Sequence, residues 1–275
     1  MSTIKTENLT ILFIGDVFGD PGIKIVQKYL PKIKENNKID FVIAQAENVS
    51  GRKGFVPKDY EILMSAGVDA FTLGNHVWAQ KEILNIINNN NIIRPLNISN
   101  SYAGHGTYVF DVKGIKLRVT SLMGIAFNRL NEPWNEDYAN NFFDCFDNLI
   151  SESIKTDYHF IDFHGETTSE KSVFSLYADG KVDAICGTHT HVQTNDARIL
   201  PNGTLYVTDA GMTGPTNSAI GANFQEVYEK MRFDGKSKFT VSPNLCQFNG
   251  VILELSKNKK ERKIKLINFL DTNEN

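Results

Sequence analysis

The chain has little cysteine, no long apolar run and no excess of basic residues. Its three cysteines stand far apart among 275 residues and none lies in a Cys-x-x-Cys pair, which argues against a disulfide framework and a cysteine-ligated zinc site. The first apolar run, Leu9 to Ile14, is too short for a signal peptide or a membrane span, so we expect a cytoplasmic protein without membrane contact. A formal net charge of −3 lacks the basic excess of proteins that wrap nucleic acid, so no stable nucleic-acid polymer is expected as a partner.

The rest of the composition, 41% hydrophobic and 22% charged, is that of a globular chain able to bury a full core. Strand-like segments over 9–14, 40–46 and 70–73 alternate with helical patterns over 22–35, interrupted near Pro31, and over 57–66 and 81–88. This alternation predicts βαβ units with parallel strands. The later part is richer in strands, with helices over 135–154 and over 169–177, the second capped by Ser169. We therefore predict an α/β sandwich of two sheets covered by helices, as a single domain over 1–275.

Five polar clusters each follow an apolar, strand-like run. They are Gly15-Asp16, Glu47-Asn48, Gly74-Asn75-His76, Phe163-His164-Gly165-Glu166 and Gly187-Thr188-His189-Thr190-His191. Loops held by a rigid sheet are where α/β proteins place their chemistry. A His-x-His pair can offer imidazoles to one metal ion or to two adjacent ions. The five clusters therefore predict one metal-binding face at the strand ends.

The donor atoms of these clusters indicate which metals and how many. The candidate ligands are Asp16, Glu47, Asn75, His164, His189 and His191. Nitrogen and oxygen donors without thiolate suit Mn, Fe, Zn or similar ions. Six side chains are too many for one catalytic ion with an open position, but suit two ions that share a bridging carboxylate. Singly, each cluster has a plainer reading, such as a turn cap for Asp16 or a core histidine for His164, and Glu166 could orient a ligand.

The order of the clusters resembles the pattern of the calcineurin-like metallophosphoesterases. Two departures stand out: Phe18 occupies a position where many members have histidine, and Glu47-Asn48 replaces a Gly-Asp motif. These departures, with the stretches over 163–171, 187–194 and 208–215, resemble the YmdB-like branch of bacterial phosphodiesterases. The likeness extends over nearly the whole chain.

The resemblance implies two mixed β-sheets flanked by helices, and two divalent or mixed-valence metal ions, Fe, Mn or Zn. Asp16, Glu47 and His191 would hold one ion, with a contribution from Asn48. The second ion would be held by Glu47, Asn75, His164 and His189. A homo-oligomer is also expected from the family.

The implied activity is hydrolysis of phosphodiesters, with 2′,3′-cyclic nucleotides such as 2′,3′-cAMP and 2′,3′-cGMP as the favoured small substrates. The expected chemistry is in-line attack by a metal-bridging hydroxide, with His76 contacting the phosphate or protonating the leaving oxygen. Arg94 and Arg129 are candidate substrate contacts. Arg129 lies in a candidate lid over 123–141 that also contains Trp134.

Three other functions stay open. A phosphomonoesterase or 5′-nucleotidase would use the same ligands. A metal-binding regulatory scaffold with little catalysis would keep them too, although inactive sites usually lose several. An amidohydrolase also uses a His-x-His pair, but normally after the first strand, whereas this pair lies at 189–191.

Overall fold

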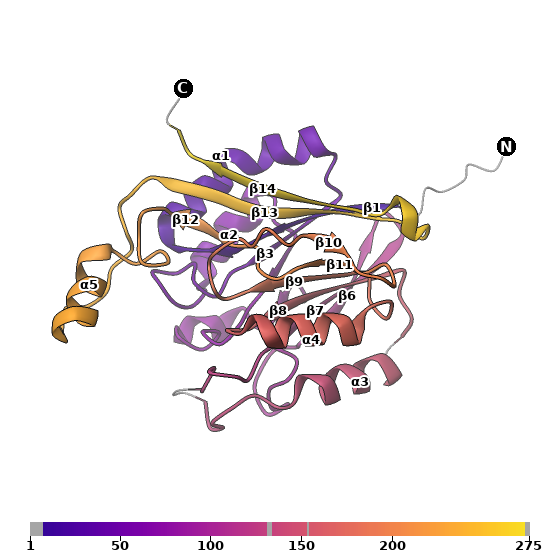
Figure 1. The fold of residues 1–275 in the computed structure, drawn as a ribbon, viewed down its shortest axis with the longest axis horizontal. Coiled ribbons are helices and arrows are strands. Elements are labelled where there is room, and N and C mark those ends of the chain that lie inside the picture. Colours follow the sequence, from indigo (N-terminus) through magenta and orange to yellow (C-terminus); the bar gives the residue numbers. More distant parts are fainter. Residues whose placement is uncertain (1–7, 131–133, 153, 273–275) are drawn as a thin grey trace.

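The computed structural model describes residues 8–130, 134–152 and 154–272, and it stacks two β-sheets between helices (Figure 1). The first sheet has the order β2-β12-β13-β1-β3-β4-β5, with β14 paired to β13. Its strands are β1 (Leu9–Ile14), β2 (Asp16–Val17), β3 (Phe41–Gln45), β4 (Ala70–Thr72), β5 (Ile92–Ile93), β12 (Met212–Pro215), β13 (Cys246–Leu255) and β14 (Lys263–Leu270).

The second sheet has the order β10-β11-β9-β8-β7-β6. Its strands are β6 (Thr107–Val112), β7 (Ile115–Met123), β8 (Tyr158–His164), β9 (Ala184–Thr188), β10 (Arg198–Ile199) and β11 (Leu205–Val207). In the first sheet β1, β3, β4 and β5 are parallel neighbours up to the edge at β5, β2 is parallel to β12, and β13 runs antiparallel to β1, β12 and β14. In the second sheet β7, β8, β9 and β11 are parallel, and β6 and β10 are antiparallel to their neighbours. The carboxyl ends of parallel neighbours therefore meet at one edge of each sheet.

Helices in the described part of the chain cover the outer faces of both sheets, except for the last one, which stands apart from them. They are α1 (Gly19–Asn37), α2 (Pro57–Ala66), α3 (Phe142–Glu152), α4 (Thr168–Ala178) and α5 (Phe224–Phe233), with 3₁₀ turns η1 (Lys81–Asn85) and η2 (Lys259–Glu261). Figure 1 shows α1 above the sheets, α3 and α4 below them, and α5 extending away from the body. No helix in the described ranges has both the length and the apolarity that crossing a membrane requires.

Strand β1 shows why the layers stack in this order. Its residues alternate between two cores, as the two-residue period of a strand requires. Ile11 and Phe13 face the second sheet, where the rings of Phe13 and Phe160 lie 4.9 Å apart. Leu12 and Ile14 face the other way, toward the core beneath α1 and α2. A strand with both faces buried consists of a continuous run of apolar residues, and such runs made the central strands predictable from the sequence.

The structure corrects four predicted details of the helices. Helix α1 continues through Pro31, because Leu30 and Ile33 on either side are anchored in the core. The segment over 81–88 forms only the 3₁₀ turn η1. Helix α3 begins at Phe142 rather than 135, since the Asn141 side chain accepts the backbone N–H of Phe143 at 2.9 Å.

The cap of α4 is Thr167, not Ser169. Its hydroxyl accepts the backbone N–H of Glu170 at 3.3 Å and donates to the Glu170 carboxylate at 2.9 Å. The threonine hydroxyl thus satisfies a helical N–H that otherwise lacks a partner.

Candidate metal centre

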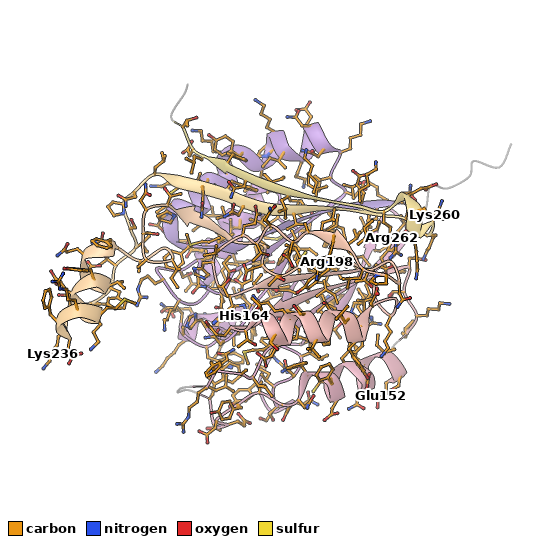
Figure 2. All side chains as sticks on the ribbon, in the orientation of Figure 1. Glu152, His164, Arg198, Lys236, Lys260 and Arg262 are labelled. Carbon is orange, nitrogen blue, oxygen red and sulfur yellow. The ribbon has the colours of Figure 1, made fainter. Side chains whose placement is uncertain are left out.

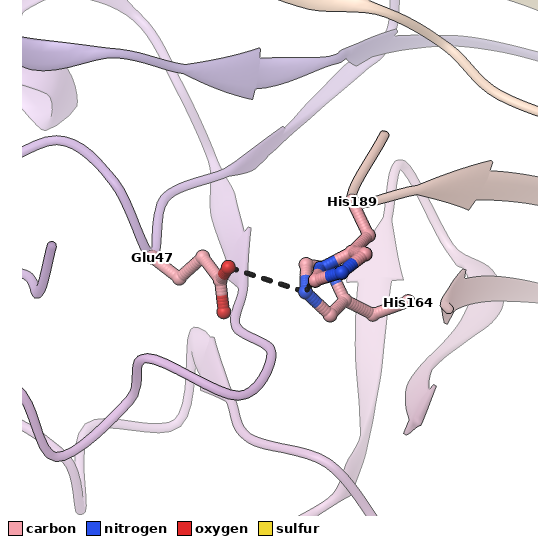
Figure 3. Close-up of side chains that lie close together, drawn as sticks. All are labelled: Glu47, His164 and His189. Carbon is pink, nitrogen blue, oxygen red and sulfur yellow. Dashed lines mark hydrogen bonds and ion pairs between the residues drawn. The ribbon is translucent and has the colours of Figure 1, made fainter. Parts of the chain in front are cut away.

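The predicted ligands come together at the carboxyl edge of the parallel strands. Asp16 follows β1, Glu47 and Asn48 follow β3, and Asn75 follows β4. From the second sheet, His164 ends β8, while His189 and His191 follow β9. His164, labelled in Figure 2, is fully buried, and Figure 3 shows Glu47, His164 and His189 turned toward one another.

Three donor atoms converge on one ring nitrogen of His164. Its Nε2 lies 3.1 Å from Glu47 Oε1, 2.9 Å from Asn75 Oδ1 and 2.9 Å from His189 Nδ1. One nitrogen carries at most one proton, so it cannot satisfy three such neighbours by hydrogen bonding. Ligand atoms of Glu47, His164 and His189 all lie within 4.8 Å of one another, so the three could hold a metal ion.

The opposite nitrogens of these histidines are held by protein groups. His164 Nδ1 lies 3.0 Å from Thr188 Oγ1, and His189 Nε2 lies 2.9 Å from Glu166 Oε2, the orienting contact predicted for Glu166. Such contacts fix the ring and its tautomer so that the other nitrogen faces the centre. Glu166 thus aims His189 Nδ1 inward.

A second group of donors surrounds Asp16. This carboxylate is fully buried, and its Oδ1 has no hydrogen-bond partner among the described residues. His191 Nε2 lies 3.7 Å from that oxygen and 3.3 Å from Asn48 Nδ2. His191 Nδ1 lies 2.8 Å from the carbonyl of Ile220 and donates to it, so Nε2 is left to face Asp16.

Burial and neighbouring charge set the ionisation of the centre. Burial raises the pKa of Asp16 despite the opposing effect of His191. Burial also opposes ionisation of Glu47, but His164 and His76 bring the pKa of Glu47 well below its usual value. For His164, burial would lower the pKa, yet Glu47 raises it to about 9. Burial and the charge of His164 lower the pKa of His189 to about 3.

These observations fit bound metal ions. A buried carboxylate oxygen without a partner is costly unless a cation or donor meets it. The donors are carboxylate, amide and imidazole, the set that suits Mn, Fe or Zn. They form two adjacent groups, one around His164 and one around Asp16. Glu47 links the groups, because its carboxylate accepts a hydrogen bond from the Asn48 side chain, which in turn contacts His191.

The backbone at the centre is adapted to close approach. A Cβ at Gly74 would lie 2.2 Å from His164 Cδ2 and 2.5 Å from Glu47 Oε2, so only glycine fits there. His189 and His191 adopt φ values of 96° and 64°, a left-handed conformation that side chains rarely take. Strain of this kind persists only where surrounding contacts impose it, and it is found at functional sites.

His76 lies at the mouth of the centre. Its backbone N–H donates to Glu47 Oε2 at 2.9 Å, and its Nδ1 lies 3.2 Å from Glu47 Oε1 and 3.1 Å from Asn48 Oδ1. The side chain is 24% exposed and lines a cavity of about 420 Å³ together with Glu47, His189 and His191. Since Nδ1 is engaged by ligand residues, Nε2 is the nitrogen available to a molecule in the cavity.

The two arginines proposed as substrate contacts lie elsewhere. Arg94 is buried, and its guanidinium donates to the carbonyls of Ala103 at 3.0 Å and Pro95 at 2.8 Å. Arg129 is exposed and pairs with Asp137 at 2.8 Å. Neither is among the residues that line the cavity, and a substrate contact by either stays a prediction.

The candidate lid over 123–141 includes residues 131–133, which lie outside the described residues. Within it, Trp134 is only 8% exposed, packs on Tyr102 with ring centroids 5.3 Å apart, and donates to the carbonyl of Asn75 at 3.3 Å. Trp134 therefore supports the loop that carries a predicted ligand.

Sequence reasoning missed an ion pair beneath the His-x-His loop. Lys171 from α4 and Asp209 after β11 are both buried and lie 2.7 Å apart. Asp209 Oδ2 also accepts the N–H and the hydroxyl of Thr190, the residue between the two histidines, at 3.2 and 2.7 Å. Asp209 could have been suspected, because it follows an apolar strand as the ligands do. Lys171 lies within a helix, and its only signal is its place at the end of the stretch over 163–171 that carries the family resemblance.

Comparison with known proteins identifies the family of the chain. The model of the YmdB-like protein family matches residues 12–267. The chain belongs to the YmdB-like family. The 2′,3′-cyclic-nucleotide 2′-phosphodiesterase of Bacillus subtilis (strain 168) is 40% identical over 263 residues, which cover 94% of this chain and 96% of that protein.

Two solved structures share the fold of this YmdB-like chain. A novel phosphatase from Mycoplasma pneumoniae is 39% identical with a TM-score of 0.88, covering 96% of this chain and 94% of that one. A hypothetical protein from Thermus thermophilus is 34% identical with a TM-score of 0.88, covering 96% of this chain and 100% of that one. The predicted family and the predicted fold, two mixed sheets flanked by helices, are confirmed.

Proposed function

We propose that this protein is a dinuclear metal-dependent phosphodiesterase that hydrolyses 2′,3′-cyclic nucleotides. The observation that carries the metal centre is the convergence of Glu47 Oε1, Asn75 Oδ1 and His189 Nδ1 on His164 Nε2, beside the unpartnered Oδ1 of Asp16, and the substrate is taken from the name of the Bacillus subtilis relative. The coarser conclusion, that the chain is a phosphoesterase, follows from its relatives, which are named phosphatase or phosphodiesterase.

Two ions would account for the observed grouping of donors. Asp16, Asn48 and His191 would hold one; Asn75, His164 and His189 would hold the other; and Glu47 would contribute to both. Bound divalent ions would lower the pKa of water and offset the negative charge of the phosphate. We propose Fe, Mn or Zn on the basis of the donor set.

The residues of the chain itself would orient the substrate and move a proton. His76 lines the cavity with Nδ1 engaged by Glu47 and Asn48, so its Nε2 is placed to protonate the leaving ribose oxygen during in-line attack by water. Phe18 lines the same cavity, with its ring centroid 5.6 Å from that of His191, in place of the histidine that many metallophosphoesterases have. An apolar ring there supplies no metal ligand, so Asn48 would take the place of the missing histidine.

The test is a substrate panel with metal-stripped protein reloaded with Mn. It contains bis-p-nitrophenyl phosphate, p-nitrophenyl phosphate, and 2′,3′- and 3′,5′-cyclic nucleotides, with Glu47→Gln as a matched control of nearly equal volume. We expect Mn-dependent cleavage of 2′,3′-cyclic nucleotides and of the diester, absent in the control. Cleavage of the monoester alone would instead establish a phosphatase, the word in the name of the Mycoplasma pneumoniae relative. Absence of hydrolysis with metal bound would favour the scaffold function.

A further inference from the structure

A second cavity adjoins the one that His76 lines. It has a volume of about 500 Å³ and shares Arg52 and Lys53 with the cavity at the metal centre. We call it the basic groove and define it by Arg52, Lys53, Gln80, Lys238, Phe239 and Thr240. It continues the catalytic cavity away from the predicted ligands.

The groove concentrates positive charge on an acidic chain. Arg52, Lys53 and Lys238 line it, and no aspartate or glutamate is found among its lining residues in the described part of the chain, although the whole chain has a net charge of −3. Glu226 lies close enough for Arg52 to affect it: hydrogen bonds from Thr240, aided by Arg52, lower the pKa of Glu226. That carboxylate is engaged by the hydroxyl of Thr240 at 2.9 Å and its N–H at 3.2 Å.

Arg52 is held in place relative to the metal centre. Its Nε donates to the carbonyl of Phe239 at 3.1 Å, and its guanidinium lies 5.4 Å from the centroid of the Phe239 ring. The loop that carries it begins at the predicted ligands Glu47 and Asn48 and is closed by the Ser50 N–H, which donates to the Gly54 carbonyl at 3.0 Å. The cation is therefore positioned by the same loop that positions two ligands.

A cyclic mononucleotide does not fill the groove: Arg52 and Lys53 also line the catalytic cavity, but Lys238 lines only the groove. The mononucleotide has one phosphate, and in the proposed reaction that phosphate lies at the metal centre. Proteins that bind single-stranded nucleic acid combine cations along the backbone with aromatic rings for stacking, and the groove contains both kinds of side chain, Arg52, Lys53 and Lys238 beside Phe239. A substrate with further phosphates beyond the one at the metal centre would bring negative charge to Lys238 and the rest of the groove.

We propose that the basic groove binds the phosphates that precede the 3′ end of an oligoribonucleotide, so that the enzyme opens 2′,3′-cyclic phosphates at RNA ends. The proposal rests on the proposed function and extends it. Water adds to phosphorus, one of the two ribose–oxygen bonds to phosphorus breaks, and the leaving oxygen takes a proton, which leaves a terminal phosphomonoester. A groove for a short end is compatible with a chain that lacks the charge to wrap a nucleic-acid polymer.

The first test compares kcat/KM for 2′,3′-cAMP and for the trinucleotide ApApA with a terminal 2′,3′-cyclic phosphate. We expect at least about tenfold higher kcat/KM for the trinucleotide at low salt, with the advantage falling as salt rises. Lys238→Ala should lower the ratio of the two values about fivefold, because one backbone contact is lost. Lys236→Ala is the matched control: Lys236 is exposed, is labelled beside α5 in Figure 2 and is not among the residues that line the groove, so its loss should not change the ratio.

A second readout does not depend on turnover. Fluorescence anisotropy would measure binding of 5′-labelled ApApA 3′-phosphate to the metal-free protein. Neutralisation of the two internucleotide phosphates in the groove predicts a slope of log Kobs against log salt of about −1.4, and Lys238→Ala should reduce its magnitude by about 0.7.

The outcomes separate the two proposals. Hydrolysis of 2′,3′-cAMP with no advantage for the trinucleotide would overturn the groove and leave the proposed function intact. Hydrolysis of neither substrate, with salt-dependent binding that Lys238→Ala weakens, would overturn the proposed function and support the groove. If the protein shows neither hydrolysis nor binding, both proposals are overturned.

Discussion

The buried pair of Lys171 and Asp209 yields a quantitative prediction about the His-x-His loop. At the observed 2.7 Å and an effective dielectric constant of about 20, the attraction between the two charges is about 6 kcal/mol. The cost of removing both ions from water offsets part of it, and removing one partner of a buried pair typically costs about 3–5 kcal/mol. We therefore expect Asp209→Asn, which keeps the shape but not the charge, to lower the free energy of unfolding by that amount.

The same substitution should weaken metal binding, because Asp209 holds Thr190 between His189 and His191. Residues that orient ligands typically change metal affinity about 10- to 100-fold. Urea unfolding measures the first effect and competition with a chelator the second. Lys171→Met alone and in combination with Asp209→Asn completes a double-mutant cycle, in which the double variant should lose less stability than the sum of the single variants.

Two results would refute this reasoning. An Asp209→Asn protein within about 1 kcal/mol of wild type would mean that the pair is not a net stabilising contact. If the effects of the two single substitutions on the free energy of unfolding are additive, and metal affinity is unchanged, the pair neither interacts strongly nor positions the loop.

Three further predictions concern single residues. His76→Gln should lower turnover about 10²- to 10⁴-fold with metal content unchanged by elemental analysis, because a proton donor is lost but no ligand; loss of metal would make His76 a ligand instead. Gly74→Ala places a Cβ 2.2 Å from His164 Cδ2, so retention of metal against a chelator should weaken about 10- to 100-fold, and wild-type retention would show that the loop can yield. His159 is buried and its pKa is lowered to about 3, whereas in the unfolded state it takes up a proton near its ordinary pKa of about 6.5. The free energy of unfolding should therefore decrease as the pH is lowered below 6.5, by at most about 1.4 kcal/mol per pH unit. Urea unfolding from pH 7 to 4 should show a shallower decline for His159→Gln, and equal slopes would contradict the assignment.

The sequence by itself determined the fold class and the set of candidate ligands. Apolar runs such as 9–14 and 40–46 reveal buried strands, and parallel strands bring their carboxyl ends to one edge, so polar clusters after those runs must meet. The types of the clustered donors then indicate metal without any coordinates. Local chemistry was less certain: Ser169 and Thr167 can both cap a helix, and only the contact with Glu170 decides between them.

Tertiary structure alone decided which side chains become neighbours away from the strand ends. Nothing in the sequence distinguishes Arg94, whose guanidinium bonds to carbonyls, from Arg52, which lines the cavity. Lys171 and Asp209 are 38 residues apart, and their pairing depends on how α4 packs against the second sheet. The physical reason is that strand and helix periods constrain the direction of a side chain within its own element, whereas its partners are set by the packing of elements distant in sequence.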